Sequence, residues 1–313
     1  MSLNNTTITT DLEAEASGGY SQDAYIHFTI AAAVALLLCL IGLVGNIIVL
    51  WDLCFKIKKN KCTTYSINLA VAYFVVLLFS VCILILNINT LNNINSDFEG
   101  KDSLYLFLEI FYDSALYSGM FILTAISVET CISVEFPVWH NCHRPKRLSI
   151  YVCVILWSIG WMESLSENLV CTSDAFVTPT PGCTAIQLIT FALAIVVCLP
   201  TMVTSSFILL IRIKKKFNHQ VSTELYAFII LTVIVFILSV IPFNFLWLLM
   251  YFHLIPTNIQ TVAFFYASIY AIVLNCTIMP FLYITAGIKW NTKSHSPEED
   301  SNTDVSTCKP DTI

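Results

Sequence analysis

Seven long apolar segments dominate this chain and restrict what it can fold into. A helix that spans a lipid bilayer needs about 20 predominantly apolar residues. Segments of this kind occupy residues 26–51, 66–88, 104–136, 148–170, 185–211, 225–252 and 261–287. Charged residues make up only 12% of the 313 residues, whereas a soluble domain has roughly 25%. The sequence therefore predicts an all-α membrane protein, a bundle of seven transmembrane helices.

The basic residues between these segments predict the orientation of the chain. Fourteen of the 15 lysines and arginines fall after the first, third, fifth or seventh segment, all on one side of the membrane. Lys101 is the exception, and it lies among acidic residues. Basic residues gather on the cytoplasmic side. An odd number of spans then places the N-terminus outside the cell and the C-terminus in the cytoplasm.

This topology divides the chain into three parts. Residues 1–25 form an extracellular tail, residues 26–287 the seven-transmembrane domain, and residues 288–313 a polar cytoplasmic tail. Residues 1–24 lack the basic and apolar regions of a signal peptide, so we expect the first apolar segment to direct insertion. Two glycosylation sequons begin at Asn4 and Asn5, although such triplets also arise by chance.

Two of the 12 cysteines are placed to form a disulfide. Disulfides form in oxidising compartments, and Cys171 and Cys183 flank the second extracellular loop. Cys82, toward the outer end of the second segment, is the main alternative partner.

Several landmarks inside the segments resemble those of G-protein-coupled receptors. Prolines within spans loosen the hydrogen-bond ladder and bend the helix. Together with residues 45–46 (GN) and 68–72 (NLAVA), the landmarks are Trp157, Pro200, Pro242 and residues 280–283 (PFLY). Each is common alone, but their order along the chain is typical of this class.

A narrower resemblance lies around the inner end of the third segment. Residues 123–129 (LTAISVE), 137–139 (PVW) and 142–146 (CHRPK) look like the corresponding run in the Mas-related receptors, a subfamily of the rhodopsin-like class. The resemblance implies a seven-transmembrane receptor of the plasma membrane that binds an extracellular ligand and a heterotrimeric G protein. It also implies a disulfide between Cys171 and Cys183.

The chain departs from this family at polar positions. Thr130 stands where Mas-related receptors have the arginine of Glu-Arg-Cys, and Tyr73 stands where the class has an aspartate. A sodium ion prefers a carboxylate, so we expect no sodium site. Met279 replaces the asparagine ahead of Pro280.

The resemblance also assigns roles by position. The microswitch positions are Asn46, Tyr73, Pro242, Pro280 and Tyr283. The candidates for the face toward the G protein are Glu129, Thr130, Cys131, Arg144, Lys146 and Arg147. The basic members can also attract membrane lipid, by about 1 kcal/mol each.

Four acids lie in the outer parts of the third and fourth predicted spans, and ionisable groups inside a span indicate function. Glu109 and Asp113 are four residues apart and share a helix face, and Glu163 and Glu167 have the same spacing in the next segment. Glu167 also matches a family position that helps to bind cationic ligands. We expect these acids to attract a cationic peptide or amine. Alternatively, one or two are protonated structural groups, because burial favours the uncharged form.

Aromatic side chains can line such a pocket and add cation–π contacts. Trp247 is the leading candidate, although aromatics at helical spacing more often serve packing. The other candidates are Tyr112, Tyr117, Trp161, Phe243, Tyr251 and Phe265.

No catalytic motif stands out, whether a glycine-rich phosphate loop, HExxH or a nucleophile–base pair outside the bilayer. We therefore expect no enzyme activity, cofactor, metal or nucleic-acid partner. The leading hypothesis is a receptor for a cationic ligand that signals through G proteins. The alternative is a receptor-like binding or partner protein without normal signalling, because Thr130 replaces the arginine.

Overall fold

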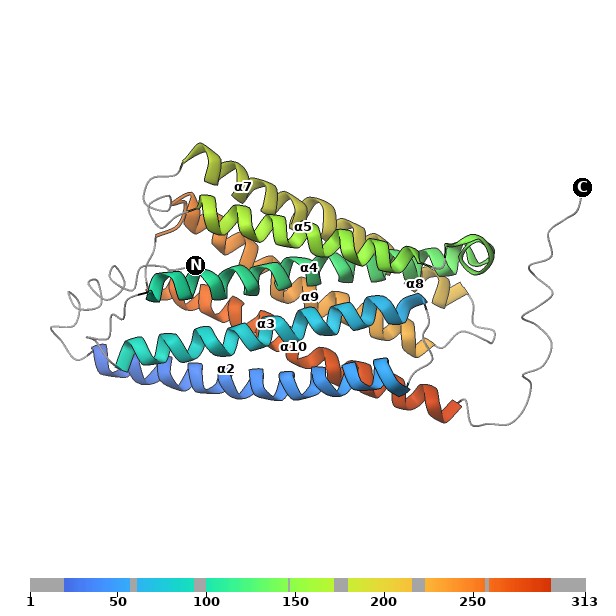
Figure 1. Ribbon diagram of the computed structural model, residues 1–313, viewed down its shortest axis with the longest axis horizontal. Coiled ribbons are helices and arrows are strands. Elements are labelled where there is room, and N and C mark those ends of the chain that lie inside the picture. The colour runs from blue at the N-terminus through green and yellow to red at the C-terminus, as the bar shows by residue number, and fades with distance from the viewer. Residues whose placement is uncertain are drawn as a thin grey trace, which may run out of the picture.

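The computed structural model describes residues 20–56, 61–92, 100–145, 147–171, 180–215, 223–256 and 259–293. Within these ranges the chain is almost entirely helical and contains no strand. The long helices lie side by side along one axis and form an elongated bundle (Figure 1).

Each of the seven predicted apolar segments corresponds to one helical stretch, and the third and sixth segments extend one residue beyond it. The first four are α2 (Tyr20–Trp51), α3 (Lys61–Asn92), α4 (Lys101–Glu135) and α5 (Leu148–Val170). The fifth comprises α7 (Pro181–Ala192), η3 (Leu193–Cys198) and α8 (Leu199–Lys215), and the last two are α9 (Thr223–Tyr251) and α10 (Ile259–Lys293). Two π-helical turns, η1 (Asp52–Lys56) and η2 (Trp139–His143), follow α2 and α4.

Six of these helical stretches are long and apolar enough to cross a membrane over their described residues. In α10 the corresponding apolar stretch, Ala267–Tyr283, is shorter. The helix itself is 35 residues long. The helices confirm the predicted fold class, a helical membrane bundle.

The fifth span contains a widened turn that the sequence analysis did not predict. The backbone N–H of Leu199 bonds to the carbonyl of Ala194, five residues earlier, at the end of η3. Pro200 follows directly. A proline has no N–H, and its ring crowds the carbonyl four residues earlier, so the preceding turn widens into a π bulge.

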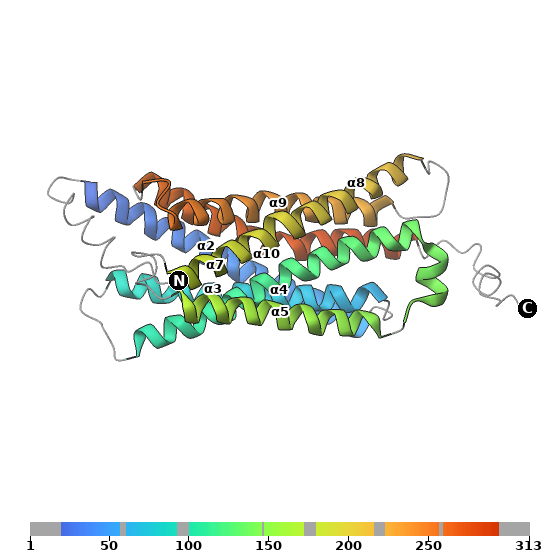
Figure 2. The ribbon, with the colours of Figure 1, turned by 90° about the horizontal axis from the view of Figure 1, so that it is seen from above.

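Helix α4 lies at the centre of the bundle, with α3, α5 and α8 packed against it. Other neighbouring pairs include α2 with α3 and α10, α9 with α8 and α10, and α5 with α3 and α7. The second view shows α4 running beside both α3 and α5 (Figure 2). Because a larger share of α4 is buried than of any other described span, its polar side chains must find partners inside the protein.

Two of the sequence landmarks join distant helices. The Asn46 side chain on α2 donates hydrogen bonds to the carbonyls of Gly42 and of Cys276 on α10, at 2.9 and 3.2 Å. The indole N–H of Trp157 on α5 donates to Asn68 on α3 at 3.0 Å. These bonds fix the rotation of α2 and α5 about their axes.

The two ends of the bundle differ in chemistry. The disulfide end holds the first turn of α4, the last turn of α5 and the first turn of α7, and is closed by the Cys171–Cys183 bond. The basic end holds η2, the start of α5 and the end of α8, with Arg144, Arg147 and Arg212. The disulfide confirms the predicted pairing, and Cys82 is a free thiol.

Candidate functional site

Glu167 is the centre of a hydrogen-bond chain at the disulfide end. Its carboxylate accepts bonds from the Tyr117 hydroxyl on α4 and from the Gln187 amide on α7, the latter at 3.0 Å. The Gln187 carbonyl accepts a bond from the Trp247 indole on α9 at 2.7 Å. One acid on α5 is therefore connected to three other helices.

Asp113 lies beside this chain. Its carboxylate accepts a 2.9 Å bond from the Asn168 amide on α5, and it interacts electrostatically with Glu167. A bond of 2.8 Å from the Ser164 hydroxyl to the Ile110 carbonyl holds α4 and α5 together at this level. Among the described residues, the hydrogen-bond donors to Asp113 and Glu167 are all neutral, so both carboxylates remain without a basic partner there.

Glu163 and Glu109 are more deeply buried, with 8% and 9% of their surfaces exposed. Glu163 interacts electrostatically with Asp113 and Glu167, and Thr190 lies near it. Neither of its carboxylate oxygens makes a hydrogen bond within the described part of the chain. Glu109 lies one turn of α4 nearer the disulfide end than Asp113. We refer to Asp113, Glu163 and Glu167 together as the acidic cluster.

The aromatic candidates differ in what their side chains contact. Tyr117 and Trp247 are bonded into the chain around Glu167, and the Tyr251 hydroxyl bonds to Thr184 at 3.0 Å. Tyr112 and Phe243 pack against the hydrophobic core. Trp161 meets Phe111 edge to face at 5.0 Å. The side chain of Phe265 lies outside the described residues.

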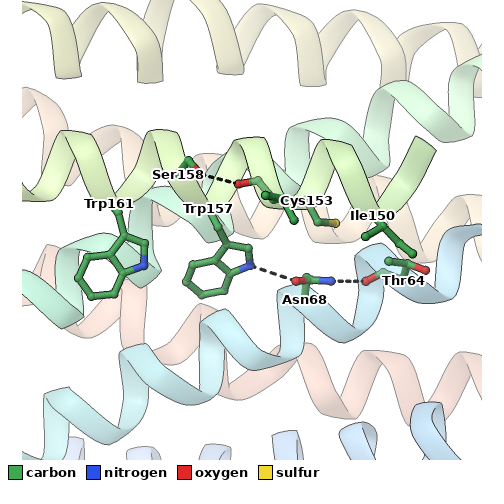
Figure 3. Close-up of a pocket in the computed structure, with 8 residues that line it drawn as sticks. Thr64, Asn68, Ile150, Cys153, Trp157, Ser158 and Trp161 are labelled. Atoms are coloured by element: carbon green, nitrogen blue, oxygen red, sulfur yellow. Dashed lines mark hydrogen bonds between the residues drawn. The ribbon is translucent and has the colours of Figure 1, made fainter. Parts of the chain in front are cut away.

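A separate groove lies between α3 and α5, and no residue of the acidic cluster lines it (Figure 3). Its volume is about 540 Å³. The lining residues are Thr64, Asn68, Ile150, Cys153, Val154, Trp157, Ser158 and Trp161. Ile150 and Val154 are more than half exposed, so the groove opens on the outer side of the bundle.

At the basic end, the acid of the third span is paired with an arginine from the turn after it. Arg144 Nε lies 2.6 Å from Glu129 Oε1, and the Arg144 side chain is completely buried. His140 Nε2 lies 2.9 Å from the same oxygen. Arg144 also donates a 2.7 Å bond to the Ser149 hydroxyl at the start of α5. We call Glu129, His140, Arg144 and Ser149 the Glu129 network.

Thr130 takes no part in the Glu129 network through its hydroxyl. It is buried, and the hydroxyl bonds to the Ile126 carbonyl one turn earlier at 2.8 Å. Cys131 is half-buried and Arg147 is exposed, whereas Lys146 lies outside the described residues. A second ion pair nearby joins Glu135 on α4 to Arg212 on α8 at 2.5 Å.

Most of the microswitch positions surround one small internal cavity of about 60 Å³. Asn46, Tyr73, Pro280 and Tyr283 all line it. Tyr73 is buried, with its ring in the hydrophobic core where the class has an aspartate. Pro242 is inside α9 on an exposed face.

Comparison with known proteins connects this architecture to a family. Residues 45–283 match the model of a protein family that is described as 7 transmembrane receptor (rhodopsin family). The chain is 32% identical to Proto-oncogene Mas of Rattus norvegicus over 252 residues, 79% of this chain and 74% of that protein. It is 32% identical to Mas-related G-protein coupled receptor member X2 of Mus musculus over 266 residues, 81% of this chain and 70% of that protein.

The chain belongs to the Mas-related receptors of the rhodopsin family. This Mas-related receptor is therefore a multi-pass protein of the plasma membrane and a G-protein-coupled receptor. The family is not enzymatic, which confirms the expectation drawn from the missing catalytic motifs.

Sequence reasoning did not identify every residue of the receptor's candidate sites. Gln187, Asn168 and His140 were missed, although Gln187 is the single amide side chain in the apolar segment 185–211. A polar residue in such a segment is itself a functional signal. The asparagines proposed for glycosylation, Asn4 and Asn5, lie outside the described residues.

Proposed function

We propose that this receptor binds an extracellular cationic peptide or amine at the acidic cluster and activates a heterotrimeric G protein through its basic end. The observation that carries the ligand proposal is the Glu167 chain, which ties one charged acid to α4, α7 and α9 through neutral donors. A cation that reaches Glu167 would therefore influence four helices at once.

Charge supports the choice of a cation. Asp113, Glu163 and Glu167 repel one another when they are ionised, and in a low-dielectric site such repulsion is strong. A cationic ligand relieves it, because each carboxylate gains an attractive partner. Trp247 would add an aromatic surface to the same site.

The distribution of basic residues supports the direction of signalling. Because basic residues gather on the cytoplasmic side, the basic end faces the cytoplasm and the disulfide end faces outward. Arg147 is exposed there, and the Glu135–Arg212 pair is also partly exposed. A G protein at this end would meet α4, α5 and α8.

Thr130 favours a second candidate function. A threonine carries no charge, so this position cannot supply an arginine to a G protein. The alternative is therefore a receptor-like protein that captures the ligand or a partner receptor without activating G protein. The two functions differ in one measurable step, nucleotide exchange on the G protein.

The test is nucleotide exchange in membranes from cells that express the receptor, with purified heterotrimers of the Gs, Gi, Gq and G12 classes and a panel of basic peptides and amines. Glu167→Gln keeps the size of the side chain and removes its charge. We expect it to weaken the response to an active cation by tenfold or more, about 1.4 kcal/mol or more.

Asp102→Asn is the matched control. It removes one negative charge from an exposed position in the first turn of α4, at the same end of the bundle. If the two variants lose the same response, general attraction of cations would explain the effect instead of the acidic cluster. If ligands bind but no heterotrimer exchanges nucleotide at normal surface expression, the alternative function is favoured.

A further inference from the structure

We propose that Arg144 supplies, from the turn after α4, the basic partner that Thr130 cannot provide, and that the Glu129–Arg144 pair is the latch that keeps the basic end in its resting form. This inference rests on the proposed G-protein function for its signalling consequence. Its structural part stands independently of that function.

Both charges of the Glu129–Arg144 pair are buried, which distinguishes it from a surface ion pair. The Arg144 side chain is 0% exposed and that of Glu129 is 9% exposed, with 2.6 Å between them. A surface ion pair would be weak because water competes for both groups. A buried charge that loses its partner is strongly unfavourable, so the position of Arg144 depends on Glu129.

The Glu129–Arg144 pair connects α4 to the segment between η2 and α5. Glu129 is on α4, whereas Arg144 follows η2 and also bonds to Ser149 on α5. His140 brings the middle of η2 onto the same Glu129 oxygen. The Glu129 network therefore fastens the turn between α4 and α5 to α4 at two residues, His140 and Arg144.

The chemistry of Thr130 explains why the turn must supply the charge. Its hydroxyl is occupied by the Ile126 carbonyl, and it cannot neutralise Glu129. The nearby Glu135–Arg212 pair reaches from α4 to α8 and is partly exposed. It holds a different pair of helices.

Breaking the latch should shift the population toward the active form, because an interaction made in one state only favours that state. We expect Arg144→Gln to raise basal nucleotide exchange about fivefold or more, a typical coupling effect. Lys56→Gln removes one positive charge from an exposed residue at the end of η1, outside the face assigned to the G protein, and serves as the matched control. It should leave basal exchange unchanged.

A second measurement does not depend on signalling. In the purified full-length receptor, hydrogen exchange of the backbone amides in η2 (Trp139–His143) should become faster in Arg144→Gln and stay unchanged in Lys56→Gln. If Arg144→Gln does not reach the cell surface, the double variant Glu129→Gln with Arg144→Gln removes the lone buried charge. It should restore surface expression and still show fast exchange in η2.

The two readouts separate the two proposals. Equal behaviour of Arg144→Gln and Lys56→Gln in both measurements would overturn the latch, whether or not the receptor signals. Fast exchange in η2 with no nucleotide exchange in any variant would support the latch and contradict the proposed G-protein function. Unchanged hydrogen exchange of the η2 amides in the double variant would also overturn the latch.

Discussion

The Gln187 side chain holds two residues of the candidate ligand site at once. Its amide N–H group donates to Glu167, and its carbonyl accepts from Trp247. Because Gln187 is only 2% exposed, water cannot replace either bond. A neutral residue therefore sets the orientation of the charged acid and of the aromatic side chain.

Replacement of Gln187 by leucine should test this arrangement. Gln187→Leu removes the Gln187 acceptor from the Trp247 indole N–H and one donor from Glu167. We expect the free energy of unfolding to fall by about 1–3 kcal/mol, the cost of an unsatisfied buried group. The measurement is thermal unfolding of the detergent-solubilised receptor.

A double-mutant cycle provides the control for this prediction. Once Gln187 is leucine, Trp247→Phe should cost less than it does in the unchanged receptor, because the indole N–H no longer has a bond to lose. Additive losses would show that the Gln187–Trp247 bond does not contribute to stability.

Small residues determine how closely the helices approach. Gly160 on α5 faces α4, and a Cβ atom added there would lie 2.2 Å from Ser118 Oγ and 2.8 Å from the Ser118 backbone nitrogen. Neither distance is possible for real atoms, so α5 can adopt its position only with glycine. This contact keeps Asp113 and Glu167 at one level of the bundle.

Gly160→Ala should therefore destabilise the receptor. Alanine gains about 1 kcal/mol in helix propensity, but overpacking costs about 1–3 kcal/mol, and a backbone atom cannot move as a side chain can. Thermal unfolding should show a net loss of stability. Gly119→Ala is the matched control, since an added Cβ on α4 meets its nearest atom at 3.5 Å. Equal stability of the two variants would contradict this role of Gly160.

The chemical difference between its two ends organises the receptor as a whole. The acidic cluster and the Cys171–Cys183 disulfide are at one end, and the Glu129 network and the exposed Arg147 are at the other. Helix α4 contains residues of both sites, Asp113 and Glu129, and lies against α3, α5 and α8. A small rotation of α4 would therefore change both sites together.

The orientation of the bundle makes a direct prediction. An epitope tag at the N-terminus should be stained by antibody on intact cells, because the positive-inside rule places that end outside. A tag at the C-terminus should be stained only after the membrane is permeabilised. An antibody against a cytoplasmic protein controls for intact membranes. The reverse staining pattern would put the acidic cluster in the cytoplasm and rule out an extracellular ligand for it.

Local sequence was sufficient for the spans and the family, and the family resemblance then implied the pairing of Cys171 with Cys183. The length of an apolar segment directly indicates a spanning helix, because a backbone in lipid must satisfy its own hydrogen bonds. The four acids were likewise visible as charges within apolar segments. None of these conclusions requires knowledge of which helices touch.

The partners of those acids depended on the packing of the helices. Tyr117 and Gln187 lie 50 and 20 residues from Glu167 in the sequence, and Arg144 lies 15 residues beyond Glu129, across the turn that follows α4. Such pairings arise from the rotation and spacing of whole helices, which the periodicity of a single segment does not specify. For that reason the sequence marked Thr130 as a missing charge, and the folded chain placed Arg144 beside Glu129.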